Sequence, residues 1–477
     1  MSEAPARQHY GVTLAVLAIA ALSYALMQTM VAPALPEIQR ELGTSATTVT
    51  WVLTVYLLTA SVATPILGRL GDMFGKERML VVVLCVFALG SVVAALSHSI
   101  GLLVAGRAVQ GAGGAVFPLA FGIIRDEFPR ERVATGIGLI SATFGIGGGA
   151  GLVLSGVIVD HLSYEWIFWF GFAVVVVAII ATHLFVPESP VKSPARVDFA
   201  GAALLSAALV CLLLGVSEGE RWGWGSPEIL ALFAGALVLL AAWVRLEQRM
   251  HQPLVDIELL RARSVWTINL TAFLTGFGMF GSFILIPQFV QTPTQAGFGF
   301  GVGVTGAGLF MMPSALVMLG AGPLAGWMAG RVGSKVPLLI GTALAATSFA
   351  LLALAHSQEW HVIVAVVLLG AGIGMSFASM ANLMVEAVPQ HQTGEATGMN
   401  TIMRTVGGAF GGQIAAAVVA AHVDAASGLP AESGFTTAFA MGAVAVAIAV
   451  VAALAIPDAR ARALGVRRRP VDAPARG

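Results

Sequence analysis

Fourteen apolar runs, each about as long as a membrane span, follow one another along this chain of 477 residues. A helix needs roughly 20 apolar residues to cross the hydrocarbon core of a bilayer. With 57% hydrophobic and only 10% charged residues, the composition does not fit a soluble domain of this size. The sequence therefore predicts an all-α membrane protein with spans near residues 11–33, 47–67, 79–97, 101–124, 134–159, 166–187, 199–217, 227–245, 266–290, 302–328, 336–356, 361–388, 396–421 and 435–457.

Lysines and arginines outside the runs lie almost entirely on one side of the predicted membrane. Alternation of the spans puts twenty-one of them on one side and two, Arg40 and Arg221, on the other. Positive residues concentrate in cytoplasmic loops, so both termini are expected in the cytoplasm. Twenty-two arginines against three lysines, with abundant Ala and Gly, indicate a GC-rich bacterial source. We therefore expect a multi-pass protein of a bacterial plasma membrane.

Several other classes find no support in the sequence. A net charge of zero gives no indication of nucleic-acid binding. The two cysteines, Cys85 and Cys211, lie in apolar runs as small buried residues, so neither a disulfide nor a metal site is indicated. We find no nucleophile–base pair and no phosphate-binding loop. The sequence thus predicts no cofactor and no enzyme, and we expect a monomer in the lipid bilayer.

Three short patterns occur twice in the same order, which indicates an internal repeat. The copies are offset by 258 to 262 residues and start at Gly68 and Gly326, at Gly111 and Gly370, and at Ala134 and Ala396. Parallel repeats of this kind are typical of transporters with a site between the two halves. We predict a six-helix half at 1–190, two inserted helices and a cytoplasmic linker at 191–264, a second six-helix half at 265–457, and a basic cytoplasmic tail at 458–477.

A charged loop with three glycines, Gly68, Gly71 and Gly75, lies between the second and third runs. Gly68 and Gly75 allow close backbone approach, and Asp72 can accept hydrogen bonds at a helix N-terminus or pair with an arginine. The spacing resembles the G-x-L-x-D-x-x-G-r-k loop of the major facilitator superfamily. The resemblance implies a latch that closes the cytoplasmic helix ends, and we expect Arg125 to be the partner of Asp72. A simple topology signal is the alternative.

Arg107 lies several residues inside the fourth span, where an ionised side chain costs at least ~2.5–3.5 kcal/mol. Gln110 lies on the same helical face. The stretch resembles the R-x-x-Q-G-x-G motif that is associated with proton-coupled members of the superfamily. A structural arginine bonded to backbone carbonyls is the alternative. Because an arginine keeps its proton, coupling would also need an acid, and Asp160 is our first candidate.

The fifth span is rich in glycine, which favours close packing or bending of a helix. Gly147, Gly151 and Gly156 align with the exporter motif g-x-x-x-G-P-x-x-G-G of the superfamily. The motif's proline is Leu152 here, and one closing glycine is Ser155. Simple helix packing is the alternative to an exporter motif.

No Asp or Glu falls in the middle of a predicted span. A cationic substrate would need a buried counter-ion, so neutral, zwitterionic or anionic amphipathic substrates fit better. Arg404, about halfway into the thirteenth span, would attract an anionic or carbonyl-bearing substrate, or it packs beside a vestibule. The other candidate substrate-binding residues are polar side chains in the first, ninth and thirteenth spans: Gln28, Asn269, Gln288 and Asn400.

Together these features resemble the EmrB/QacA-type drug:proton antiporters, which have fourteen spans. The resemblance implies a major facilitator fold with two extra central helices. It also implies export of small amphipathic compounds, such as antibiotics or biocides, in exchange for protons. A dedicated exporter of one metabolite is the first alternative. A membrane sensor that transports nothing is the alternative from another class.

Overall fold

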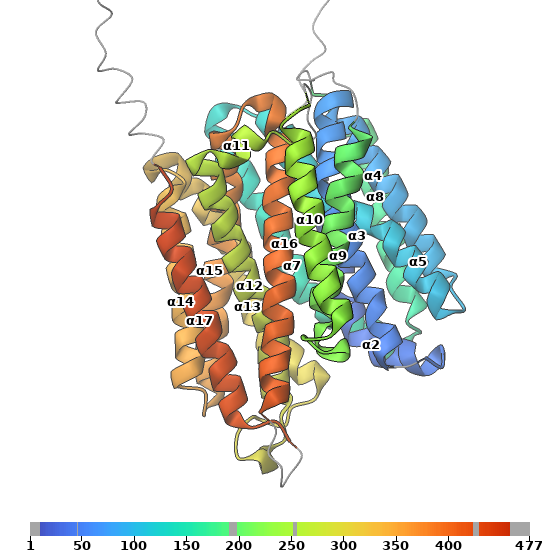
Figure 1. Ribbon diagram of the computed structural model, residues 1–477, viewed down its shortest axis with the longest axis vertical. Helices are drawn as coiled ribbons and strands as arrows, with labels where there is room; N and C mark the ends of the chain where they lie inside the picture. The colour runs from blue at the N-terminus through green and yellow to red at the C-terminus, as the bar shows by residue number, and fades with distance from the viewer. Residues whose placement is uncertain (1–9, 45, 190–197, 251–254, 423–428, 458–477) are drawn as a thin grey trace, which may run out of the picture.

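The computed structural model describes all residues except 1–9, 45, 190–197, 251–254, 423–428 and 458–477. The described part is built from helices and contains no strand (Figure 1). The α-helices are α1 Tyr10–Thr29, α2 Val31–Glu41, α3 Ala46–Phe74, α4 Lys76–Ala95, α5 Ile100–Gln110, α6 Val116–Glu127, α7 Arg130–His161, α8 Glu165–Phe185, α9 Phe199–Trp222, α10 Pro227–Glu247, α11 Ile257–Arg261, α12 Arg263–Gln291, α13 Val304–Val332, α14 Lys335–Leu354, α15 Glu359–Ala387, α16 Thr393–Ala421 and α17 Glu432–Leu454. Three 3₁₀ turns are η1 Gly111–Ala115, η2 Thr294–Ala296 and η3 Gln390–Gln392.

The predicted fourteen spans are confirmed, because fourteen segments of the described chain are long and apolar enough to cross a membrane. Two of these segments are interrupted. The first span continues from α1 into α2, and the fourth consists of α5, η1 and α6. At η1 the chain passes close to α3, since a side chain at Gly111 would overlap Thr59. The glycine-rich sequence of η1 allows this contact.

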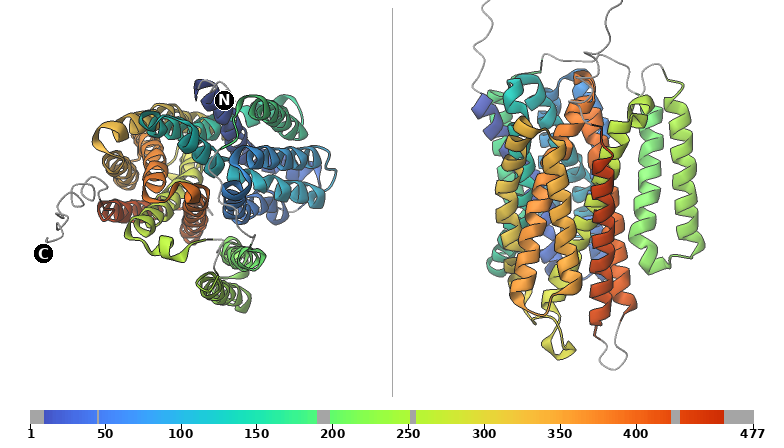
Figure 2. Two further views of the ribbon diagram at one scale, coloured as in Figure 1. Left: turned by 90° about the horizontal axis from the view of Figure 1, so that it is seen from above. Right: turned by 90° about the vertical axis from the view of Figure 1, so that its left-hand side faces the viewer.

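The helices form two bundles of six spans with two further helices outside them (Figure 2). In the first bundle α1 packs on α7 and α8, and α4 packs on α5 and α8. In the second, α12 packs on α16 and α17, while α15 packs on α13 and α14. This is the expected major facilitator arrangement. The residue boundaries of its parts, at 190 and 264, stay a prediction.

Two seams join the bundles, and the repeated sequence patterns meet in them. At one seam α3 lies against α16, where a side chain on Gly68 would come 2.7 Å from the backbone oxygen of Gly394. At the other, α13 lies against α7, where a side chain on Gly326 would come 2.5 Å from the oxygen of Ala134. The repeat thus places small residues where the two halves approach most closely.

The inserted helices α9 and α10 pack on each other and lie along the α3–α16 seam. Buried side chains of α9, including Leu205 and Leu209, pack in one cluster with Met399 and Ile402 of α16 and with partly buried residues of α3. The insertion therefore contacts both halves.

Candidate functional site

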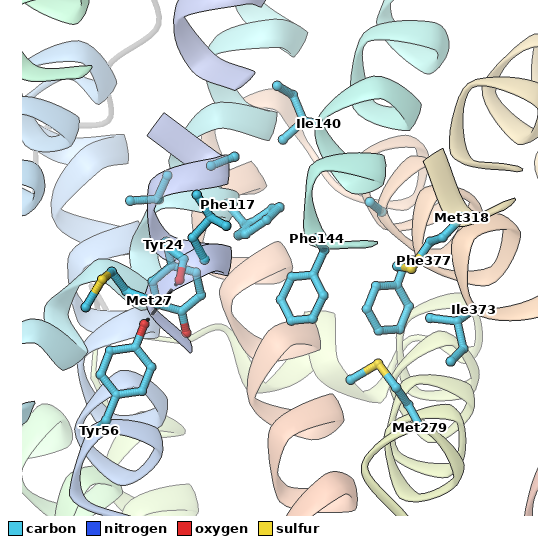
Figure 3. Close-up of a cluster of buried hydrophobic side chains, with 14 of the residues drawn as sticks. Tyr24, Met27, Tyr56, Phe117, Ile140, Phe144, Met279, Met318, Ile373 and Phe377 are labelled. Carbon is cyan, nitrogen blue, oxygen red and sulfur yellow. Dashed lines mark hydrogen bonds between the residues drawn. The ribbon is translucent and has the colours of Figure 1, made fainter. Parts of the chain in front are cut away.

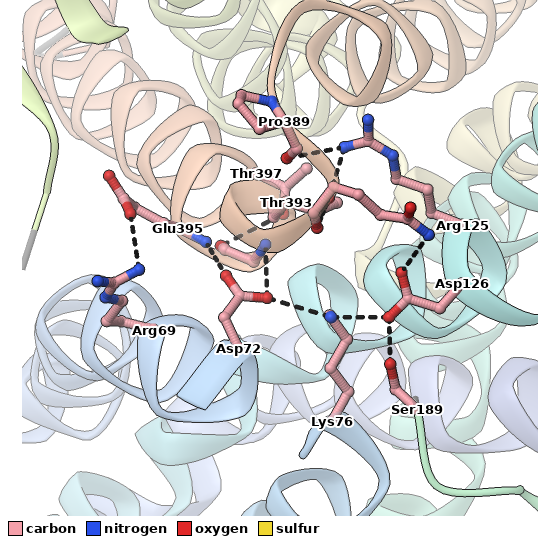
Figure 4. Close-up of polar contacts among 12 residues, drawn as sticks. Arg69, Asp72, Lys76, Arg125, Asp126, Ser189, Pro389, Thr393, Glu395 and Thr397 are labelled. Atoms are coloured by element: carbon pink, nitrogen blue, oxygen red, sulfur yellow. Dashed lines mark hydrogen bonds and ion pairs between the residues drawn. The ribbon is translucent and has the colours of Figure 1, made fainter. Parts of the chain in front are cut away.

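The end of the bundle that carries Asp72 is closed by polar contacts between the halves (Figure 4). The Asp72 side chain is fully buried, and its two carboxylate oxygens accept hydrogen bonds from the backbone N–H groups of Gly394 (3.4 Å) and Glu395 (3.2 Å). These are the first-turn donors of α16, which the helix itself cannot satisfy. Asp72 thus caps a helix of the opposite half.

Lys76, also fully buried, joins this carboxylate to a second one. Its Nζ lies 3.3 Å from Asp72 Oδ1 and 2.7 Å from Asp126 Oδ2, and Ser189 donates to the same Asp126 oxygen. The buried ammonium thus bridges two buried carboxylates and gives each of them a charge-assisted contact. Lys76 was not singled out in the sequence, because lysines beside a membrane face are usually topology signals.

Arg125 reaches the same end of α16 by a different route. Its guanidinium donates to Thr393 Oγ1 (2.6 Å) and to the carbonyl oxygens of Val388 (2.8 Å) and Pro389 (3.3 Å). The expected ion pair between Asp72 and Arg125 is therefore wrong, since Lys76 occupies the position beside Asp72. Asp72 and Arg125 instead form hydrogen bonds with neighbouring groups at the N-terminus of α16.

Two glycines of the loop, Gly68 and Gly75, have separate steric roles. Gly68 lets α3 touch α16, as described above. Gly75 has φ +114°, a conformation that favours glycine, and a side chain there would overlap the Glu188 carboxylate. Gly333 repeats this conformation in the second half with φ +90°. Gly75 thus allows the tight turn that places Asp72 and Lys76 on adjacent helix ends.

A further carboxylate in this network comes from the opposite half. Glu395 is 1% exposed, accepts a 2.6 Å hydrogen bond from the backbone N–H of Asp256, and lies 3.5 Å from Arg69 Nη1. Asp256 belongs to the segment between α10 and α11. No sequence pattern predicted these contacts, because Arg69, Asp256 and Glu395 are far apart along the chain.

Arg107 is fully buried in the first half, and its Nε and Nη1 have polar partners while its buried Nη2 has none among the described residues. It donates to the carbonyl oxygens of Val52 (3.0 Å) and Met27 (3.4 Å) and to Gln110 Oε1 (2.8 Å). Its Cζ also lies over the Tyr56 ring, 3.9 Å from the centroid. Among the described residues no carboxylate contacts Arg107, so the geometry resembles the structural alternative raised by the sequence.

Asp160, the predicted acid, lies in the last turn of α7 at the end opposite Asp72. Its side chain is outside the part that the structure describes, so its role stays a prediction. Gln110 extends the hydrogen-bond network of Arg107 to Ser91, because Gln110 Nε2 donates a 2.7 Å hydrogen bond to Ser91 Oγ.

The glycines of α7 serve two opposite faces of that helix. Side chains on Gly147 and Gly151 would overlap Ala25 and Thr29 of α1, and Thr29 Oγ1 donates to the Gly147 carbonyl (2.8 Å). Gly149 faces Ala315 of α13 in the same way, whereas Gly156 has open space around it. Helix packing explains Gly147 and Gly151, and the structure gives no contact that requires Gly156.

A row of aromatic rings crosses the middle of the molecule from one half to the other (Figure 3). Successive centroids lie 5.6–6.1 Å apart along Tyr56, Tyr24, Phe117, Phe144 and Phe377. The last step, from Phe144 of α7 to Phe377 of α15, passes between the halves. Edge-to-face and offset pairs at such distances are favourable.

A small cavity lies beside the last two rings, with residues of both halves in its wall. Its volume is about 10 Å³, which is about the room that one water molecule needs. The first half contributes Phe117, Phe121, Ser141 and Phe144, and the second contributes Phe377, Ala381, Thr397, Asn400, Thr401 and Arg404. A drug-sized ligand would need the halves to separate here.

Two of the predicted substrate-binding residues line this cavity, namely Asn400 and Arg404. Asn269 lies behind them, where its Oδ1 accepts a 3.1 Å hydrogen bond from Asn400 Nδ2. Gln28 and Gln288 do not line it, and Gln288 is exposed on α12. Sequence reasoning missed Ser141, Phe144 and Phe377, because a single serine or phenylalanine in an apolar helix carries no signal.

The chain belongs to the Major Facilitator Superfamily, whose family model matches residues 17–412. It is 28% identical to the tetracenomycin C resistance and export protein of Streptomyces glaucescens, over 81% of this chain and 72% of that protein. It is also 28% identical to the multidrug transporter protein MdtP of Bacillus subtilis, over 80% of this chain and 70% of that protein.

Two further similarities concern length and fold. An uncharacterized MFS-type transporter of Mycobacterium tuberculosis, Rv1877, is 31% identical over 78% of this chain, which spans about half (54%) of that longer protein. The crystal structure of the human organic anion transporter MFSD10 (TETRAN) has a TM-score of 0.69 at 17% identity. That similarity covers 93% of this chain and 99% of the human chain, and at this identity it shows the fold alone.

Proposed function

We propose that this protein is a secondary active exporter of small amphipathic compounds, including antibiotics and biocides. It works by alternating access in exchange for protons. Membership of the superfamily and the names of the two bacterial relatives support export of such compounds. The observation that carries the proposal is the cavity between the halves, with walls from both and polar contacts closing the seam at the Asp72 end. A site with this position is open to one side of the membrane at a time.

In this scheme the Asp72 end is cytoplasmic, as the positive-residue asymmetry indicates. The contacts of Gly68, Asp72, Gly75 and Arg125 form the latch of the outward-facing state. Arg107 and Gln110 act in proton coupling with Asp160. Asn400 and Arg404 bind substrate directly, and Asn269 orients Asn400. The protein acts as a monomer in a bacterial plasma membrane.

The orientation is tested by cysteine labelling of intact cells. In a background with Cys85 and Cys211 replaced by serine, cysteines at Ser357 and Ser433 are expected to react with an impermeant maleimide from outside. A cysteine at Ser193, which lies outside the described residues, is expected to react only after the cells are opened. Labelling at Ser193 in intact cells would reverse the proposed orientation.

Transport itself is tested with the purified full chain in liposomes. An acidic lumen is expected to drive uptake of an amphipathic compound, and that compound is expected to release lumenal protons. A dedicated exporter of one metabolite, like the named function of the Streptomyces relative, would respond to a single compound of a drug panel. Uptake that ignores the gradient would identify a facilitator, and no uptake across the panel would favour a sensor.

A further inference from the structure

Arg404 is partly buried within its span, and its guanidinium has no hydrogen-bond acceptor among the described residues. Its Cζ lies 4.3 Å from the centroid of Phe377 and 5.7 Å from that of Phe144. Among the described residues, none accepts a hydrogen bond from its guanidinium. Cation–π contacts attract the charge but use none of the five N–H donors. These donors are left to the cavity that Arg404 lines.

A second unsatisfied polar group lies in the wall of the same cavity and comes from the other half. Ser141 of α7 is 3% exposed, and its hydroxyl has no hydrogen-bond partner among the described residues. The neighbouring hydroxyls of Thr397 and Thr401 donate to helix carbonyls. A buried hydroxyl without a partner costs free energy, so Ser141 is available to a ligand.

The charge balance around the cavity also favours an anion. Arg107 is fully buried inside the fourth span and Arg404 is partly buried near the middle of the thirteenth, while the buried acids of the described spans, such as Asp72 and Glu395, lie at helix ends. Two cations without a carboxylate at their depth make the centre of the molecule electropositive. A cationic ligand would find no counter-ion there.

We propose that Arg404 and Ser141 form the binding site for a planar aromatic anion, such as a carboxylate, sulfonate or phenolate on a fused ring. This inference rests on the proposed exporter and names its substrate class. The ionised oxygens accept from the planar fork of Arg404 and from the Ser141 hydroxyl. The ring of the ligand stacks against Phe144 and Phe377. Because Ser141 and Arg404 belong to opposite halves, the anion bridges them.

The test is calorimetric titration of the purified full chain with three probes that share one ring system. They are 2-naphthalenesulfonate, its uncharged sulfonamide, and trimethyl(2-naphthyl)ammonium, and the sulfonate is ionised at every working pH. Wild type is expected to bind the sulfonate at least tenfold more tightly than the other two probes. Arg404→Gln is expected to remove this preference, because charge-assisted hydrogen bonds contribute about tenfold or more to affinity.

Three further variants separate the site from general effects. Arg404→Lys keeps the charge without the planar fork and is expected to weaken sulfonate binding several-fold, with no change for the sulfonamide. Ser141→Ala is expected to cost roughly two- to tenfold for the sulfonate only. Arg245→Gln removes an exposed arginine of α10 and is expected to bind like wild type. If the Arg404→Gln protein does not fold, the sulfonate affinities of Arg404→Lys and Ser141→Ala test the site instead.

Equal affinity of wild type for the three probes, or an intact preference in a folded Arg404→Gln protein, would overturn the anion site. Calorimetry measures binding without transport. The anion site and the exporter function can therefore be rejected independently of each other. Arg404-dependent binding without gradient-driven uptake would retain the site and reject the exporter. Gradient-driven uptake of the ammonium probe, unchanged by Arg404→Gln, would retain the exporter and reject the site.

Discussion

Each half places one arginine inside a membrane span, Arg107 fully buried and Arg404 partly buried, and the surroundings of the two side chains differ. Arg107 donates to two carbonyls and to Gln110, and only its Nη2 has no partner among the described residues, whereas Arg404 has aromatic faces and no acceptor among them. Both lie over a ring, Tyr56 in the first half and Phe377 in the second. These rings are the two ends of the aromatic row across the molecule (Figure 3).

This difference shows how a protein can use one residue type for two purposes. A guanidinium that donates three hydrogen bonds to the protein fixes the helices around it, and fewer of its donors are left for a ligand. A guanidinium stabilised only by ring faces keeps its charge and its donors for a ligand. We therefore assign Arg107 to the machinery that moves the halves and Arg404 to recognition of substrate.

Replacement of Arg107 is expected to have the largest effect. Arg107→Ala leaves the buried Gln110 Oε1 without its donor and should lower stability by on the order of 2 kcal/mol. Gradient-driven uptake should fall to background, and Arg107→Lys should also fail, because lysine lacks the planar fork. Thermal unfolding and uptake by the same preparations measure both effects. Full uptake by Arg107→Lys would show that the arginine is only structural.

Opening of the latch by substitution of Asp72 tests whether the surroundings of Arg404 are more accessible from the Asp72 end than those of Arg107. Asp72→Asn removes the charge that caps α16 and pairs with Lys76, so the cytoplasmic end should open more often, by roughly five- to thirtyfold for 1–2 kcal/mol. In the Cys-free background, a cysteine at Ser141 should then react faster from the cytoplasmic side. A cysteine at Ser91, beside Gln110, should stay unreactive. Equal acceleration at both positions would indicate general loosening instead.

Removal of the two rings gives a smaller and matched comparison. Phe377→Leu removes the nearer cation–π contact of Arg404, which contributes about 1 kcal/mol, and should weaken binding of 2-naphthalenesulfonate several-fold. Tyr56→Leu removes the corresponding contact of Arg107 and should leave that affinity unchanged. Calorimetry on the two variants measures the difference, and equal losses would place both arginines in one site.

The sequence predicted the fold well because membrane spans are set by length and composition, and both are visible in a single chain. The repeat also indicated the two halves, and the structure places its copies that start at Gly68 and Gly326 in the two seams. The latch role of Asp72 was implied by the resemblance of its loop to the superfamily motif, and it stays a prediction. Arg404 was selected as a charge at a known depth in a span, and it lines the cavity.

Partners across the seams could not be predicted in the same way. Lys76 takes the place expected for Arg125 because the turn at Gly75 brings α4 beside Asp72. The cavity depends on Phe144 and Phe377, and its polar wall on Ser141, and these are ordinary residues of apolar helices. Their importance follows from which face of each helix meets the other half, and the uniformly apolar spans carry too little periodicity to fix that face.

The most direct test of the two roles is the kinetics of gradient-driven uptake of 2-naphthalenesulfonate into proteoliposomes. Arg404→Gln is expected to raise KM at least tenfold with a small change in the maximal rate, because it removes a group that binds substrate. Arg107→Lys is expected to lower the maximal rate by about a hundredfold or more with KM nearly unchanged. If both variants alter the same parameter, or if their effects are exchanged, the division of roles between the two arginines is wrong.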